Sequence, residues 1–567
     1  MNYCLSSQLE TMAETAREFC NGQKLLCVAI ISSLYLVIAG LISSWRMLWN
    51  DELFTVYIAR LESLSDILGA LSTGADQNPP SFYFITRVFL TLLGESPLTV
   101  RLPEILGVLL LSICLFLFVS HRLPVLYGIA AMIFPLTTTA FEYAYEARPY
   151  GLVLGFSGSA LLCWQRAADH SRSVWWLIGL TASGAAAISC HYYAVLLLVP
   201  LGAGELARTW SNRRIDYPAW ICLGLTLFPL LVFFPLLQEA RSYSQHFWAH
   251  PEWKNIPAFY YFLLTPTVGP IIATLVFAAI WPGNERSMVP SPEKASQGLS
   301  LHETAAALGF VAVPAIALIL AKLATGAFTN RYALMSVVGF SILSPVAILR
   351  ASSRRGMMGL CFVTFLSGWF IVSGVTQIKH QRFIASSWLK TYDFLQAADH
   401  TKLPIVAADL HSFMTMRYYA PRDLSTRVVY LANQQASVKY LGHDTVDRGI
   451  LDLNRWFRLA VEEYVPFMAA RPRFLIYARV RGVPSWLGYY WIEPVNLNWL
   501  FCELSTAPVE IELKGWSDND LLFLVTPHAA EQSENQGPER FAGALKFSES
   551  DGTQFLRRNL CVASGPF

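Results

Sequence analysis

The sequence predicts a polytopic α-helical membrane protein with a C-terminal α/β domain outside the membrane. Of its 567 residues, 54% are hydrophobic and only 14% are charged, whereas an average soluble domain has about 25% charged residues. Apolar runs long enough to cross the ~30 Å hydrocarbon core recur up to about residue 375. From about residue 376 the long apolar runs stop and charged residues become more frequent.

About eleven apolar segments have roughly the length of a membrane crossing. They are residues 25–44, 102–120, 124–142, 150–165, 174–190, 191–207, 217–237, 259–281, 304–322, 331–349 and 357–375. The first segment has no small-residue cleavage site, so we expect it to be retained rather than removed as a signal peptide. Residues 82–94 are short and interrupted by Arg87, and we expect them to be re-entrant or interfacial.

Lys and Arg concentrate in alternate loops, which predicts that these loops are cytoplasmic. The N-terminal segment 1–24 is then cytoplasmic, and the C-terminal domain is extracytoplasmic. Residues 25–375 form the transmembrane domain, whose first outer loop, 45–101, is long enough to indicate a functional role. Two amphipathic stretches in this loop, Leu53–Leu61 and Leu64–Leu71, predict helices that lie along the membrane.

Residues 376–528 are expected to form the α/β domain, because apolar strand patterns alternate there with helical ones. Strands are predicted at 403–409, 473–478 and 521–525, and helices at 387–397 and 453–470. The polar residues 529–567 are expected to form a loosely ordered tail. Cys502 and Cys561 lie in this C-terminal part, and the sequence leaves open whether they pair.

The composition argues against several classes of function. The net charge of +2 gives no sign of a nucleic-acid partner. His246, His250 and Glu252 are too loosely spaced to predict a metal site, so no metal ligands are assigned and a divalent metal remains open. The chain has no phosphate-cradling Walker A or GxGxxG loop in a supporting context. Any phosphorylated donor is therefore expected to be tethered to the membrane.

Acidic residues open the first outer loop, in Trp49-Asn50-Asp51-Glu52. A helix N-terminus also attracts Asp and Glu, so capping and function are equally good explanations of this pair alone. Asp76-Gln77-Asn78-Pro79-Pro80 follows, and its two prolines fix an extended turn before the next apolar segment. Such a turn can hold Asp76 or Asn78 over the membrane, or it can be a plain connection into a helix.

A second polar stretch, Glu142 to Tyr150, precedes the crossing predicted at 150–165. Glu142 and Glu146 are expected to share a helical face, and Pro149 to end this helix or begin the next. Arg148 offers bidentate contacts to a phosphate, although a local ion pair with Glu146 explains it equally well. His191-Tyr192 and Arg331-Tyr332 lie at other outer boundaries, where interfacial anchoring and snorkelling are the simpler explanations.

In this order, these landmarks resemble those of bacterial GT-C glycosyltransferases, in the branch similar to protein mannosyltransferases and lipid A aminoarabinose transferases. The resemblance also includes Arg101-Leu102-Pro103 and extends over about residues 25–375. It implies an enzyme of the bacterial inner membrane that uses a polyprenyl-phosphate-sugar donor on the extracytoplasmic face. The sequence departs from the commonest pattern at Asn78, where a His or Lys often precedes the two prolines.

The resemblance implies inverting sugar transfer, with Asp51 as the base that deprotonates the acceptor. Arg148 and Arg331, followed by Arg101, are then expected to stabilise the leaving phosphate. The other expected substrate-binding residues are Glu52, Asp76, Asn78, Glu146, Tyr150, His191 and Tyr332. The sugar is not determined, and lipid A, a polysaccharide, a protein or another lipid can be the acceptor.

Two further classes of protein remain open. A transporter or flippase of lipid-linked sugars would show internal repeats and polar residues at mid-membrane. The sequence shows no clear repeat, and its charged residues cluster at the outer boundary. A non-catalytic glycan-binding membrane protein with the same fold is the other alternative.

Overall fold

The computed structural model describes residues 11, 14–169, 173–280, 298–351, 355–399, 401–479, 499–517 and 520–527. The chain divides into two compact units. The first, the helical unit, contains residues up to 46, 77–241 and 249–381. The second, the α/β unit, contains 47–76, 242–248 and the chain from 382 onward, so the expected boundary at 376 lies inside a helix. The predicted tail 529–567 lies outside the described residues.

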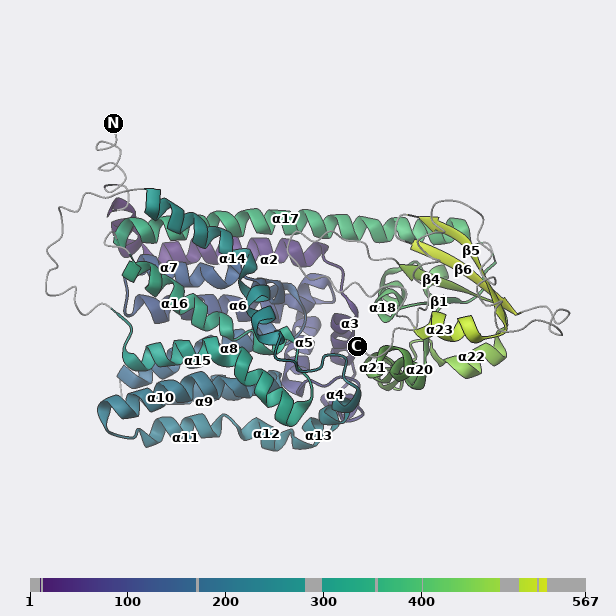
Figure 1. Cartoon of the computed structure of the whole chain (residues 1–567), viewed down its shortest axis with the longest axis horizontal. Coiled ribbons are helices and arrows are strands. Elements are labelled where there is room, and N and C mark those ends of the chain that lie inside the picture. Colours follow the sequence, from purple (N-terminus) through teal and green to yellow (C-terminus); the bar gives the residue numbers. More distant parts are fainter. Residues whose placement is uncertain are drawn as a thin grey trace. The chain divides into compact units, whose positions relative to one another are not determined.

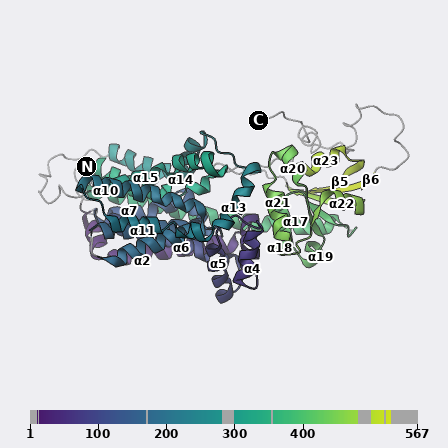
Figure 2. The same cartoon turned by 90° about the horizontal axis from the view of Figure 1, so that it is seen from below.

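The helical unit is a bundle in which α2 packs on α6, α6 on α8, α8 on α9 and α10 on α15 (Figure 1). Helix α6 also packs on α7, and α10 on α11; Figure 2 shows the same bundle from below. The α-helices are α2 Lys24–Trp45, α5 Pro80–Leu93, α6 Pro97–Ser120, α7 Val125–Ile133, α8 Tyr150–Asp169, α9 Val174–Cys190, α10 Leu198–Asn212, α11 Tyr217–Leu225, α12 Phe228–Val232, α13 Phe234–Ser242, α14 Asn255–Ile280, α15 Leu301–Leu320, α16 Ser336–Ala351 and α17 Arg355–Ala398.

Five helices within the described residues are long and apolar enough to cross a membrane, and up to seven crossings result if each of two bent pairs counts as one. The chain is therefore a multi-pass membrane protein, while the expected number of about eleven crossings stays a prediction. One bent pair joins 125–137 to 139–145 at 73°, where a single crossing at 124–142 was expected. Here α7 passes into the short 3-10 helices η1 Phe134–Thr137 and η2 Thr139–Tyr145. Helix α5 has 14 residues, fewer than the ~20 of a full crossing, and the expectation that residues 82–94 are re-entrant or interfacial stays a prediction.

Glycines bring α6 and α8 into close contact. A Cβ atom added to Gly107 would lie 2.4 Å from the Gly151 carbonyl oxygen. A Cβ atom added to Gly155 would lie 2.4 Å from the Gly107 carbonyl oxygen. These two helices can approach at this distance only where side chains are absent, as is common for packed helices in membranes.

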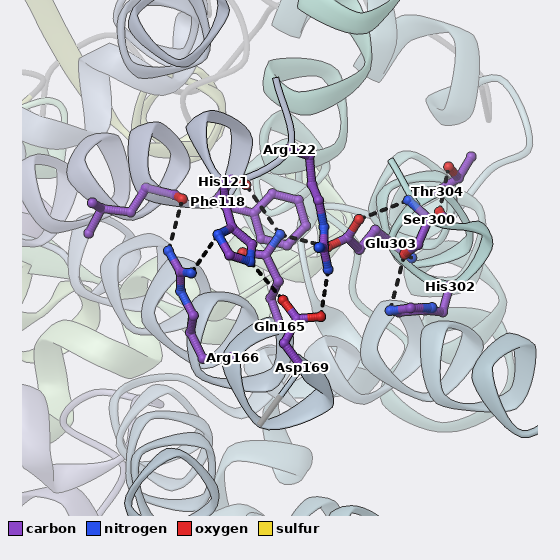
Figure 3. A network of polar contacts seen from close by, with 11 residues as sticks. Phe118, His121, Arg122, Gln165, Arg166, Asp169, Ser300, His302, Glu303 and Thr304 are labelled. Atoms are coloured by element: carbon purple, nitrogen blue, oxygen red, sulfur yellow. Dashed lines mark hydrogen bonds and ion pairs between the residues drawn. The ribbon is translucent and has the colours of Figure 1, made fainter. Parts of the chain in front are cut away.

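A polar cluster joins the other end of α6 and α8 to the start of α15 (Figure 3). Glu303 is fully buried, and its Oε1 accepts hydrogen bonds from Arg122 Nε at 2.8 Å and from Gln165 Nε2 at 2.7 Å. Arg122 also donates to Asp169, which the His121 ring contacts at 2.7 Å. We call these five residues the inner polar cluster; it ties three helices together.

The α/β unit contains a six-stranded sheet in the order β3-β2-β1-β4-β6-β5. The first four strands in this order are parallel, while β6 is antiparallel to both β4 and β5. The strands are β1 Ile405–Ala407, β2 Val428–Ala432, β3 Val461–Glu463, β4 Phe474–Arg479, β5 Val509–Ser517 and β6 Asp520–Pro527. The strands predicted at 403–409, 473–478 and 521–525 are therefore confirmed as β1, β4 and β6.

Helices cover both faces of this sheet. On one face, alternate residues such as Phe474 and Ile476 of β4 pack with α20 Gln434–Leu441, α22 Tyr464–Ala470 and α23 Trp499–Thr506 (Figure 1). On the other face, the Tyr477 hydroxyl donates to Asp520, which also accepts from Thr391 near the end of α17. The remaining helices are α18 Leu410–Tyr419, α19 Arg422–Ser425 and α21 Thr445–Asn454.

The first outer loop forms two helices in this unit, α3 Asn50–Ala59 and α4 Leu64–Ser72, as predicted from its amphipathic stretches. The Tyr243 hydroxyl lies 2.8 Å from the Gly74 carbonyl oxygen and 2.7 Å from Asp452 Oδ2. Trp456 Nε1 donates to Thr73 Oγ1 at 2.9 Å. The loop is thus anchored to residues about 380 positions later in the chain.

The prediction of one continuous helix over residues 453–470 is wrong. Helix α21 ends at Asn454, and residues 461–463 form β3 before α22 begins at Tyr464. The backbone of 461–463 pairs in parallel with 430–432 of β2, so sheet formation overrides the helical pattern. Strands β2, β3 and β5 were not predicted.

Candidate functional site

The acidic pair of the first outer loop lies on the first turn of α3, and the two carboxylates differ. Glu52 is fully buried, and its Oε2 accepts a hydrogen bond from the Trp49 backbone N–H at 3.2 Å. This contact is half of a capping box, so Glu52 has a structural role in starting the helix. Asp51 is only partly buried, and its Oδ1 accepts from Asn50 Nδ2 at 3.2 Å. Asp51 therefore keeps an accessible surface that Glu52 lacks.

The Asp76–Pro80 turn leads directly into α5. Pro80 is the first residue of that helix, and Pro79 precedes it with an extended backbone, φ −61° and ψ 158°. Proline suits the first helical position because the N–H that it lacks has no partner there. Asp76 belongs to the α/β unit and Asn78 to the helical unit, and each is only 7% exposed.

Arg101 has a structural role in the helical unit. It is fully buried on α6, and its Nη1 donates to the backbone oxygens of Ser43 at 2.8 Å and Arg46 at 2.6 Å. These carbonyls belong to the last turn of α2, where they have no partner within the helix. Arg101 thus caps α2, which is a sufficient reason for an arginine at this position.

The stretch before α8 is not the helix expected from the spacing of Glu142 and Glu146. Helix η2 ends at Tyr145, and Glu146 is extended, with φ −127° and ψ 121°. The Arg148 N–H then donates to the Glu146 oxygen, and the Tyr150 N–H to the Arg148 oxygen, both at 2.7 Å. Because these tight turns direct successive side chains differently, Glu142 and Glu146 share no helical face. Pro149 was expected either to end one helix or to begin the next; it directly precedes α8, which starts at Tyr150, and its carbonyl oxygen accepts from the Val153 N–H.

The carboxylate of Glu146 pairs with an arginine that sequence reasoning missed. Arg46 Nη2 lies 3.4 Å from Glu146 Oε2, and Arg46 Nη1 donates to the Tyr145 oxygen at 3.2 Å. Glu146 is 8% exposed and Arg148 is 6% exposed. Two guanidinium groups and one carboxylate therefore lie in a largely buried segment just before α8.

A small pocket in the same unit is built from aromatic rings around a cation. Its lining includes Tyr150, His191, Tyr193, Arg331 and Tyr332. The His191 ring lies 5.3 Å from the Tyr150 ring and 5.2 Å from the Tyr332 ring, centroid to centroid. The Arg331 guanidinium lies 5.8 Å from the Tyr150 centroid, a cation–π arrangement. We call this set the cation–aromatic pocket.

The pocket residues lie where helices end or begin, and these ends orient their side chains. His191 ends α9 with an extended backbone, and its Nδ1 accepts from the Tyr193 N–H at 3.2 Å, which makes Nε2 the protonated nitrogen of the neutral ring. Arg331 and Tyr332 lie in the short 3-10 helix Asn330–Ala333 before α16. Tyr193 stacks on Tyr332 with centroids 4.4 Å apart and was not predicted. The sequence feature that could have identified Tyr193 is its position directly after His191-Tyr192.

Tyr150 links the pocket to the polar stretch before α8. Its side chain lies within electrostatic range of Arg331, Tyr332, Arg148 and Glu146. Of the predicted site residues, the helical unit thus brings together Glu146, Arg148, Tyr150, His191, Arg331 and Tyr332. Within the described parts of the chain, no three His, Cys, Asp or Glu side chains meet in a way that could hold a metal ion.

The fold and the pocket together define a class of protein: a multi-pass helical membrane protein with a buried cationic site and an α/β domain. Residues 77–238 match the family model of dolichyl-phosphate-mannose-protein mannosyltransferases. No curated protein matches the sequence.

Solved structures share the architecture of almost the whole chain. The apo crystal structure of ArnT from Cupriavidus metallidurans has a TM-score of 0.55 at 11% identity, covering 89% of this chain and 98% of ArnT. The crystal structure of the same enzyme bound to undecaprenyl phosphate has a TM-score of 0.54 at 12% identity, covering 91% and 99%. The chain therefore shares the fold of ArnT, and residues 77–238 are similar to the mannosyltransferase family, in line with the resemblance that its motifs indicate.

Proposed function

We propose that this protein is an inverting glycosyltransferase that moves a sugar from a polyprenyl-phosphate donor to an acceptor on the extracytoplasmic face of the membrane. The observation that carries the proposal is the cation–aromatic pocket, which lies beside Arg148 in a bundle of GT-C fold. Arg148 is buried and Arg331 is partly buried, and a guanidinium withdrawn from water is stabilised by an anion. The aromatic rings suit the apolar faces of a sugar. The undecaprenyl phosphate bound to ArnT supports a lipid phosphate as that anion.

In this reaction the acceptor oxygen or nitrogen attacks the anomeric carbon while the bond to the lipid phosphate breaks. Negative charge builds up on the departing phosphate oxygen. Arg331 and Arg148 are the groups that we assign to stabilise this charge. The rings of Tyr150, His191 and Tyr332 limit access of water to the pocket that contains Arg331, which strengthens its interaction with the phosphate.

Asp51 is the proposed general base, which takes the proton of the acceptor as it attacks. The partial exposure of Asp51 supports this choice over Glu52, whose carboxylate is buried and caps α3. Help from a general base is typically worth about 10²–10⁴-fold in rate. Asp76 and Asn78 are proposed to position the substrate beside the Pro79–Pro80 turn.

The proposed orientation places the α/β unit outside the cytoplasm. Cys502 in this unit is disulfide-bonded, while all seven other described cysteines are free. Disulfides persist in oxidising compartments such as the bacterial periplasm and are rare in the cytosol. The chemistry of Cys502 therefore supports an outer location for this domain.

The test compares the wild type with Asp51→Asn in proteoliposomes that contain a polyprenyl-phosphate sugar and a panel of acceptors. Asp51→Asn should bind donor lipid normally but lose sugar transfer by at least about 100-fold. Asp66→Asn is the matched control, because Asp66 is a partly exposed first-turn carboxylate of the neighbouring helix α4. It should transfer sugar at the wild-type rate. Equal transfer by Asp51→Asn and the wild type would refute the base assignment, and lipid movement without any sugar transfer would favour a flippase.

A further inference from the structure

Glu104 is an ionisable residue inside an apolar helix, and the site described above does not include it. It lies on α6 between Pro103 and Ile105, and its side chain is completely buried. A carboxylate within a membrane-spanning segment is costly and marks a functional or strongly structural position. The signal was present in the sequence as the only acid within the predicted crossing 102–120.

The Glu104 carboxylate holds the start of a different helix. Its Oε2 accepts a hydrogen bond from the Leu152 N–H at 2.7 Å, and the Gly151 backbone adds a further favourable interaction with the same carboxyl group. These are the second and third residues of α8, whose N–H groups have no partner within the helix. A negative charge is favoured there by the helix dipole as well. Glu104 thus supplies the N-terminal cap of α8 from the neighbouring helix.

Steric fit makes this contact specific. A Cβ atom on Gly151 would lie 2.8 Å from Glu104 Oε2 and 2.7 Å from the Glu104 backbone oxygen. Only glycine therefore allows the carboxylate to reach the amides. The residue immediately before these two amides is Tyr150, whose ring faces His191 and Arg331 in the cation–aromatic pocket.

Within the described residues, Glu104 Oε1 is buried and has no hydrogen-bond partner. The side chain lies within electrostatic range of both Glu146 and Arg148. Glu104 therefore lies in the electrostatic environment of the same polar segment that precedes α8.

We propose that Glu104 is a positioning residue that fixes the start of α8, and with it Tyr150 and Arg148, in the geometry that binds the donor phosphate. This role rests on the proposed glycosyltransferase function. Glu104 acts through α8 and does not touch the reacting atoms. Without its carboxyl group, the first turn of α8 loses the acceptor for the Leu152 amide, and Tyr150 and Arg148 lose their fixed position.

The experiment measures steady-state sugar transfer and, separately, the affinity for undecaprenyl phosphate, both per folded protein. Glu104→Ala should raise the KM for the donor and the Kd for undecaprenyl phosphate about tenfold, with kcat reduced less than about threefold. Glu104→Gln keeps an oxygen that can accept from the Leu152 N–H, and should restore both values to within about threefold. Glu104→Asp keeps the charge but withdraws it from the amides, so it should behave like Glu104→Ala.

The matched control is Gln165→Ala, which removes a buried polar link between the same two helices at their other end. Gln165 Nε2 donates to the Phe118 oxygen at 3.2 Å and to Glu303. This variant should be less stable but keep the wild-type KM and Kd. If Glu104→Ala does not accumulate, Glu104→Asp and Glu104→Gln provide the same comparison.

Wild-type KM and Kd in Glu104→Ala or Glu104→Asp would overturn the positioning role. An equal rise in Gln165→Ala would also overturn it, because the effect would then be general loosening of the bundle. A wild-type protein that neither binds undecaprenyl phosphate nor consumes donor would refute the proposed function itself, and this role with it.

Discussion

Replacing Glu303 by Ala should destabilise the helical unit strongly, because this one carboxylate is the hub of the inner polar cluster. Its Oε1 accepts from Arg122 Nε and Gln165 Nε2, and its Oε2 from the Ser300 backbone N–H at 2.9 Å (Figure 3). The Ser300 hydroxyl in turn accepts from the Glu303 N–H, which completes a capping box at the start of α15. Alanine would leave three donors without their acceptor.

The magnitude follows from the burial of these donors. A buried donor left unsatisfied costs about 1–3 kcal/mol, and loss of a helix cap about 0.5–2 kcal/mol. Gln165 is fully buried, whereas the Arg122 side chain is 25% exposed and can recover part of its loss in water. The expected total is therefore about 3–5 kcal/mol, as for other broken buried ion pairs. A domain of this size should then lose about 6–15 °C in Tm.

Thermal unfolding of the purified protein in lipid nanodiscs measures this effect. Glu303→Gln should lose roughly half as much as Glu303→Ala, because an amide oxygen still accepts one or two of the hydrogen bonds. Glu252→Ala is the control, since Glu252 pairs with Lys254 at 2.8 Å while the two side chains are 54% and 76% exposed. An exposed pair contributes little, so the control should shift Tm by less than about 2 °C. A Glu303→Ala variant no less stable than this control would refute the reasoning.

Three further predictions concern other sites. Arg331→Ala should lower kcat about 10²–10³-fold in the sugar-transfer assay, and Arg331→Lys should lower it by less. Equal activity of the wild type and both variants would exclude a role of Arg331 at the leaving phosphate. Burial raises the pKa of Asp399, but hydrogen bonds from Thr401 and Arg427 outweigh it and leave the pKa below its usual value. Asp399 therefore stabilises the fold above about pH 4, so the Tm advantage over Asp399→Asn should disappear as the pH falls further; an advantage that grows in acid would contradict this sign. Cys502 should resist alkylation until a reductant is added, and Cys502→Ser should cost about 2–4 kcal/mol of stability; labelling without reductant would contradict the disulfide.

Local patterns in the sequence predicted most of the helical unit. The helix periodicity and apolar length at 25–44 and 102–120 suffice to predict α2 and α6, because a segment of that composition can satisfy its backbone in lipid only as a helix. The bend between α7 and η2 was not predictable in this way, since both pieces are apolar. In the α/β unit, β3 is only three residues long and forms because its residues pair with those of β2, 31 positions earlier in the chain.

The site was predicted in part. Tyr150, His191 and Arg331 were recognisable as polar or aromatic residues at the ends of apolar segments, and the structure brings them into one pocket. Glu104 and Arg46 were missed because their partners are distant: Leu152 is 48 positions from Glu104, and Glu146 is 100 positions from Arg46. Without those partners, Glu104 is only an acidic residue in an apolar run, and Arg46 is only a cation after a predicted crossing.

The sequence by itself determined that this is a multi-pass membrane protein whose landmarks resemble those of GT-C glycosyltransferases, because composition, apolar length and ordered motifs are local properties of the chain. Only the tertiary structure decided which charges share an environment. It assigned Glu52 and Arg101 to helix ends, paired Glu146 with Arg46, and placed Arg331 against Tyr150. The physical reason is that a buried charge takes its role from the donors and acceptors around it, and the fold brings these from distant parts of the chain.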